Sequence, residues 1–210
     1  MSYKNDRYMK LVKDIDKSGQ KKHEVSDKQA EEAFKTILTW IGEDPNREGL
    51  LETPKRVIKA FSEHFGGYDQ DPKEILLKTF EETESYDDMV LLKNIEFESH
   101  CEHHMLPIIG FASIAYFPDK EIVGISKLAR LLNLFAKRLQ TQEVMTAQII
   151  NAIETHLKPI GSAVFIEAEH HCMKSRGVHK QNSTMVTSQF RGCFANDKSL
   201  QDRFLGLIKQ

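Results

Sequence analysis

The sequence predicts an α+β protein in which helices come first and an antiparallel sheet follows. Apolar residues recur at helical spacing over residues 26–66, and after an acidic stretch at residues 81–88 the pattern changes to strands rich in β-branched and aromatic residues. The connections between most of these strands are short, which is typical of antiparallel neighbours. With 210 residues, the chain is long enough to bury one sizeable core.

The composition excludes several classes of protein. Apolar residues make up 40% of the chain and charged residues 29%, with a net charge of −2, so no general nucleic-acid surface is expected. No apolar run approaches the length of a membrane span, and the N-terminal residues are charged rather than signal-like. We therefore expect a cytoplasmic protein whose cysteines stay reduced.

We divide the chain into three parts. Residues 1–25 are rich in Lys and Asp and carry few large apolar side chains in register, so a flexible charged arm is expected. Residues 26–88 form an N-terminal helical segment. Residues 89–210 form the catalytic domain, which holds the candidate zinc ligands described below.

Two helices are expected in the N-terminal segment. Ser26 and Gln29 have the spacing of a capping box, and Gly42 ends the helix that they begin. Thr53 stands before a proline, as a cap residue often does, and the second helix runs from there to Gly66.

The catalytic domain alternates strands and helices. Strand patterns cover residues 89–98, 108–117, 121–125, 162–169 and 184–190. Helical patterns begin at Ser126, whose hydroxyl is expected to cap the helix, at Thr141, and at Ser199, which is expected to cap the last helix.

Two short clusters of thiols and imidazoles stand out. Soft sulfur and borderline nitrogen are the ligands that zinc prefers. Cys101 and His104 are three residues apart, so a tight turn can direct both at one ion. The second cluster follows an expected strand, and residues two apart on a strand share a face, so His170 and Cys172 should point the same way.

Cys101, His104 and Cys172 supply three ligands. Three ligands favour a catalytic zinc with one position left for water, because structural zinc normally has four. Spacing alone does not decide between His103 and His104; the histidine left over and His170 can act as acid or base. A closed structural zinc with a fourth histidine and a disulfide between the two cysteines are alternatives, and a reducing compartment argues against the disulfide.

Charged residues near helix starts are candidates for substrate binding. Lys127 and Arg130 lie on one side of the first turns of their helix, where free amides and two cations can hold a phosphate. Glu143, preceded by Gln142, can accept two N–H donors from one edge of a guanine base. Arg56 lies in the first turn of an earlier helix. Taken singly, each of these residues is more often an ordinary surface side chain than a binding residue.

The segments that carry these residues form one ordered set: Thr53-Pro54-Lys55-Arg56-Val57, Cys101-Glu102-His103-His104, Gly124-Ile125-Ser126-Lys127-Leu128-Ala129-Arg130, Gln142-Glu143 and His170-His171-Cys172-Met173-Lys174-Ser175-Arg176-Gly177. In this order and at these intervals they closely resemble the GTP cyclohydrolase I family. The resemblance covers roughly residues 26–210, and the joint match is far more specific than any single motif. Ile125 stands where a leucine is common, which is a change of similar volume.

The resemblance implies a role for each candidate. The zinc ligands would be Cys101, His104 and Cys172, and the catalytic histidines His103 and His170. Purine recognition would fall to Gln142 and Glu143. Contacts to the ribose and triphosphate would come from Ser126, Lys127, Arg130 and Arg176, and from Arg56, which would reach in from a neighbouring subunit.

The resemblance also implies a fold, an assembly and a reaction. The fold would be the tunnelling fold, an antiparallel sheet with helices on one face, and the assembly a homodecamer of two pentamers with active sites at subunit interfaces. The reaction would open the guanine imidazole ring of GTP by hydrolysis. It would release formate and give 7,8-dihydroneopterin triphosphate, the first step of tetrahydrofolate and pterin biosynthesis. Two other readings stay open: another pterin or purine enzyme of this fold, although the two cysteines contradict a three-histidine site, and a non-catalytic interaction protein stabilised by zinc.

Overall fold

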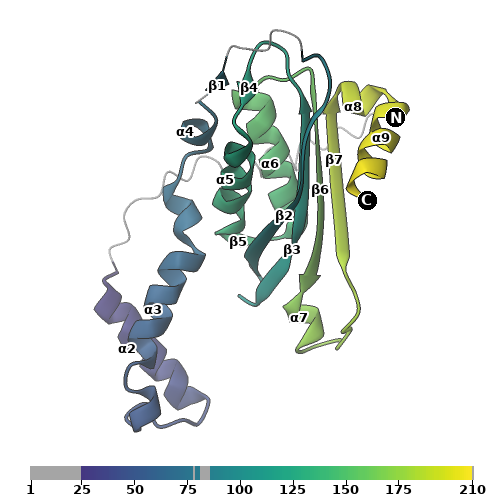
Figure 1. Ribbon diagram of the computed structural model, residues 1–210. Helices are drawn as coiled ribbons and strands as arrows, with labels where there is room; N and C mark the ends of the chain where they lie inside the picture. The colour runs from purple at the N-terminus through teal and green to yellow at the C-terminus, as the bar shows by residue number, and fades with distance from the viewer. Residues whose placement is uncertain (1–24, 78, 81–85, 210) are drawn as a thin grey trace, which may run out of the picture.

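The computed structural model describes residues 25–77, 79–80 and 86–209. The charged arm expected at residues 1–25 therefore lies, except for its last residue, outside the described part. A five-stranded sheet forms the centre of the molecule (Figure 1). Its strand order is β5 (Leu139–Gln140), β2 (Val90–Cys101), β3 (Pro107–Phe117), β6 (Gly161–His170) and β7 (Met185–Gly192).

The four long strands are antiparallel neighbours, as the sequence predicts. The short strand β5 was not predicted, and it pairs with β2 in parallel. Strand pairing brings the two clusters of cysteines and histidines close together. His100 on β2 lies opposite Pro107, and Ile108 on β3 lies opposite His170. The carboxyl ends of β2 and β6 therefore meet at the same end of the sheet.

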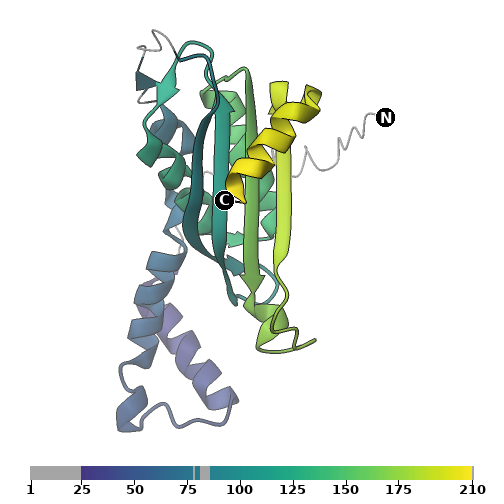
Figure 2. The same cartoon turned by 45° about the vertical axis from the view of Figure 1, so that its right-hand side comes forward.

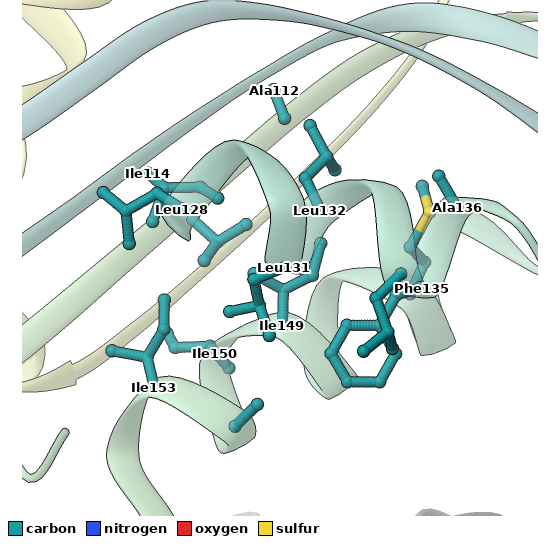
Figure 3. Packing of buried hydrophobic residues seen from close by; sticks show 14 of the residues in the cluster. Ala112, Ile114, Leu128, Leu131, Leu132, Phe135, Ala136, Ile149, Ile150 and Ile153 are labelled. Carbon is teal, nitrogen blue, oxygen red and sulfur yellow. The ribbon is translucent and has the colours of Figure 1, made fainter. Parts of the chain in front are cut away.

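Helices α5 (Ile125–Ala136) and α6 (Gln142–His156) cover one face of the sheet. Their apolar stripes interlock with the sheet side chains Ala112 and Ile114 (Figure 3). The helix residues in this core are fully buried: Leu128, Leu131, Leu132, Ile149, Ile150 and Ile153. Burial of each such side chain contributes about 1.5–3 kcal/mol, so this layer fixes the helices to the sheet.

The opposite face is covered at one end by α8 (Cys193–Asn196) and α9 (Lys198–Ile208), as Figure 2 shows. Phe194 and Phe204 are fully buried there in a second cluster with Ala163. The fold is α+β with helices on the sheet, as predicted, and the C-terminal helices add cover on the second face. The expected cap Ser199 was wrong: Asp197 caps α9 and accepts from the Ser199 amide at 2.8 Å.

The N-terminal helices α2 (Asp27–Trp40) and α3 (Thr53–His64) project away from the sheet (Figure 1). The capping box of α2 is confirmed, since Ser26 and Gln29 each bond the other's backbone. Thr53 is not a cap: Glu52 already has a helical ψ of −4°, so Thr53 is the first helical residue.

Short elements connect the N-terminal helices to the sheet. They are the 3₁₀ turns Glu48–Leu50 and Gly66–Asp69, helix α4 (Pro72–Leu76), and the paired strands β1 (Thr79–Phe80) and β4 (Ile122–Val123). Among the described residues, no helix is both long and apolar enough to span a membrane.

Candidate metal and active site

The turn between β2 and β3 carries the first pair of site residues. Cys101 is the last residue of β2, and its amide donates to the Leu106 carbonyl at 2.9 Å while its carbonyl accepts from the Met105 amide at 2.7 Å. Met105 has a φ of 53°, a left-handed conformation that closes the turn. The Glu102 amide donates to Gln140 on β5. These backbone bonds hold the two histidines of the turn at the rim of the sheet.

The second pair is placed differently from the prediction. Strand β6 ends at His170, and residues His171–Lys174 form the short helix α7. Cys172 therefore lies on a helical turn, and the expectation that it shares a strand face with His170 was wrong. Lys174 is buried and its Nζ lies 2.7 Å from Glu169 Oε2, a contact that ties this turn back to β6.

The structure brings Cys101, His104 and Cys172 together, with one donor atom of each within 4.8 Å of the others. Cys101 is buried, Cys172 is half-buried and His104 is exposed. Both sulfurs are free thiols, so the disulfide alternative does not describe this structure. In the described part of the chain, no fourth Cys, His, Asp or Glu joins the group. Because only three donors are present and His104 is exposed, a metal held here would have room for a further ligand.

The chemistry of these donors fits zinc. Two sulfurs and one imidazole are the ligand types that zinc takes in proteins. Burial raises the pKa of the Cys172 thiol, and the neighbouring Cys101 raises it further. A bound divalent cation reverses this effect, because it stabilises the thiolates and releases their protons.

Two further side chains flank the cluster. His103 is exposed, and its Nδ1 lies 3.8 Å from Cys101 Sγ. Arg176 Nη1 donates to His104 Nε2 at 3.0 Å. A guanidinium can only donate, so this nitrogen must be unprotonated. If His104 bound a metal through either ring nitrogen, its Nε2 could no longer accept this hydrogen bond. Arg176 would then be free to bind an anion.

His170 is held by Gln142, a contact that sequence reasoning missed. Its Nε2 lies 2.8 Å from Gln142 Oε1. Burial lowers the pKa of His170, and the charge of Glu143 partly offsets that effect. The two partners are 28 positions apart and meet only because α6 packs on β6, so no local pattern signals the contact.

Glu143 is exposed beside a hollow of about 290 Å³. The hollow lies between α6 and β7 and is lined by Glu143, Thr146, Ala147, Thr187, Ser188 and Gln189. A larger hollow of about 600 Å³ is lined by four glutamates, Glu96, Glu98, Glu167 and Glu169, among other residues. Its carboxylates disfavour an anionic ligand, so we take the smaller hollow as the candidate binding site.

Three of the expected ribose and phosphate residues, Ser126, Lys127 and Arg130, lie on α5. Helix α5 leads at its carboxyl end into β5, which pairs beside Cys101, whereas its first turn follows β4, near Tyr116 at the far end of the sheet. At 1.5 Å per residue, Ser126 lies about 15 Å along the axis from Ala136. Ser126 does not cap the helix, because the cap position belongs to Gly124.

The structure thus divides the predicted site residues into two sets. One set gathers around the metal cluster: Cys101, His103, His104, Gln142, Glu143, His170, Cys172 and Arg176. Within the described part of one chain, no hydrogen bond or ion pair joins the other set to the cluster: Ser126, Lys127 and Arg130 on α5, and the exposed Arg56 on the projecting helix α3.

Together the covered sheet, the three-donor cluster and the held histidine define an α+β protein with a site that can hold a metal. A family model described as GTP cyclohydrolase I matches residues 30–209, so the chain belongs to that family.

Relatives agree with this assignment. A protein of Pelagibacter ubique called GTP cyclohydrolase 1 is 58% identical over 202 residues, which is 96% of this chain and 100% of the relative. Proteins of the same name from Hyphomonas neptunium and Bartonella henselae are 57% and 56% identical. They cover 88% and 87% of this chain, and 90% and 88% of their own length.

Proposed function

We propose that this protein is a zinc-dependent GTP cyclohydrolase I. It opens the guanine imidazole ring of GTP by hydrolysis, releases C8 as formate and gives 7,8-dihydroneopterin triphosphate, the first step of tetrahydrofolate and pterin biosynthesis. The observation that carries this proposal is the Cys101, His104 and Cys172 cluster, with His170 beside it, in a chain of this family.

Each residue near the cluster has a task in this reaction. Cys101, His104 and Cys172 would hold the zinc, which would activate water as a nucleophile near neutral pH. His170 donates a proton to N7 of the guanine, which makes C8 a better electrophile. His103 moves protons as the ring opens and formate leaves.

Substrate recognition uses the residues around the hollow. The carboxylate of Glu143 accepts from N1–H and the 2-amino group of guanine, a pair of donors that adenine lacks on this edge. Ser126 assists the opening of the ribose. An Amadori rearrangement and ring closure then give the product. Two waters are consumed in ring opening and formate release and one is lost on closure, so the reaction takes up one water.

The triphosphate undergoes no chemistry, so the cations that bind it act by positioning. Arg176 belongs to the metal side of the site, whereas Lys127 lies in the first turn of α5 and Arg130 near its middle. We therefore infer that a neighbouring copy supplies Lys127 and Arg130 to each metal cluster, and that Arg56 also acts on another subunit. In a closed ring, every copy has a neighbour that can supply these cations. This inference supports the homodecamer of two pentamers implied by the family.

We infer a cytoplasmic location from the chemistry of the ligands. Two free thiols 4.8 Å or less apart stay available to a metal only where the compartment is reducing.

The test is GTP turnover by zinc-loaded protein under reducing conditions, with formate and dihydroneopterin triphosphate measured together. The proposal expects both products in equal amounts. Protein that binds one zinc per chain and leaves GTP intact would overturn the enzymatic role and support a structural zinc instead.

A further inference from the structure

The side chain of Gln142 is fully buried and its amide has one possible orientation. Its Nε2 donates to the carbonyl of Ile166 at 3.1 Å, to the carbonyl of Met185 at 3.0 Å and to the hydroxyl of Thr187 at 3.2 Å. Two carbonyls can only accept, so the amide nitrogen must face them. The amide oxygen is then fixed on the opposite side.

This oxygen determines which ring nitrogen of His170 carries the hydrogen when the ring is neutral. It lies 2.8 Å from His170 Nε2, and because an amide oxygen only accepts, Nε2 must carry a hydrogen. The neutral ring therefore has its lone pair on Nδ1. That nitrogen makes no hydrogen bond within the described protein and is not among the buried unpaired atoms, so it remains accessible to solvent.

We propose that Gln142 is a positioning residue, which holds the His170 ring in one orientation and one tautomer so that Nδ1 is the nitrogen left to contact the substrate. This proposal rests on the proposed function. It differs from the direct purine contact that the family resemblance implies for Gln142, because both amide hydrogens and the oxygen are already used inside the protein.

An amide is suited to this task. A carboxylate in its place could accept from Nε2–H, but it could not donate to the carbonyls of Ile166 and Met185, and two backbone acceptors would lose their partner. The amide also brings no charge into a fully buried position. It can accept the same Nε2–H bond whether or not Nδ1 carries a proton.

The first test compares the kinetics of Gln142→Leu and Gln148→Leu. Gln148 is a matched control, since it is also buried on α6 and accepts from Gln140 at 2.8 Å, with no contact to His170. Loss of a partner that orients a functional histidine costs about 10- to 100-fold. We expect Gln142→Leu to lower kcat by this factor with little change in KM for GTP, and Gln148→Leu to keep both.

The second test observes the ring directly. Solid-state NMR of zinc-loaded protein labelled with ¹⁵N-histidine, without GTP, separates the two neutral tautomers, and the His170 signal is the one absent from His170→Gln. We expect wild-type His170 to carry its hydrogen on Nε2, and Gln142→Leu to give a mixture. The wild-type measurement decides the hydrogen bond even if Gln142→Leu does not fold.

Two results would overturn the positioning role. One is a hydrogen on Nδ1 in the neutral ring of active wild-type protein. The other is a Gln142→Leu enzyme with unchanged kcat and a raised KM, which would indicate a direct purine contact. Wild-type protein that leaves GTP intact would instead overturn the proposed function, and the NMR spectrum would still report the tautomer separately.

Discussion

The sharing of one active site between copies can be tested by complementation. One variant, Cys172→Ala, lacks a metal ligand but keeps the cations of α5. The other, Lys127→Ala/Arg130→Ala, keeps the metal cluster but lacks those cations. Each variant alone should be nearly inactive, because every site in it carries a defect. The question is whether mixed oligomers regain turnover.

The structure sets the expected magnitude. Lys127 and Arg130 lie about 14 Å and about 9 Å along α5 from Ala136, the end that leads into β5 beside Cys101. If a neighbouring copy supplies these cations, as proposed, each complete site takes one half from each of two copies. With equal amounts and random assembly, half of the metal sides and half of the phosphate sides are intact. The two probabilities multiply, and about a quarter of the sites are complete in both halves.

The assay co-expresses the two variants with different affinity tags and purifies oligomers that carry both. Formate release from GTP is then compared with that of wild-type protein and of each variant alone. Recovery of about a quarter of the wild-type rate supports the shared site. Mixed oligomers with no more activity than the separate variants would refute it, because a site within one chain always carries one of the two defects.

Three further predictions concern the metal, the acid stability and the core. Cys172→Ala should lose its zinc and its turnover, whereas His170→Ala should keep zinc by elemental analysis and lose about 10²- to 10⁴-fold in kcat; an active Cys172→Ala without metal would contradict the zinc role. The Arg203 guanidinium, with the Met89 amide adding to it, lowers the pKa of Asp88 from 3.8 to about 2, so this ion pair stabilises the fold above pH 3.8 and the stabilisation is lost as pH falls to about 2. Arg203→Gln should therefore unfold at a lower temperature than wild type near neutral pH, and a difference that persisted at pH 2 would contradict this assignment. Leu131→Ala should cost about 2–5 kcal/mol of unfolding free energy in chemical denaturation, because that side chain is fully buried between α5 and its neighbours, and a cost near zero would mean that the core is not packed as described.

Local features of the fold were predictable because they depend on neighbours in the sequence. The capping box at Ser26 and the strand at residues 108–117 are found where expected. The errors occur where two local signals compete. Alternation of apolar and polar residues along β6 favoured a strand through Cys172, but a helical turn begins there, and it is accompanied by the ion pair of the buried Lys174 with the exposed Glu169. Similarly, Ser199 looks like a cap until Asp197, two residues earlier, is seen to take that role.

The sequence by itself determined the chemical identity of the candidate site. Cys101 and His104 meet through one tight turn, and spacing within a turn can be read from the chain. Tertiary structure alone decided which residues act together, because such contacts depend on how helices pack on the sheet. Only packing of α6 on β6 reveals that Gln142 holds His170, and only the course of α5 shows that Lys127 lies away from the metal cluster in its own chain.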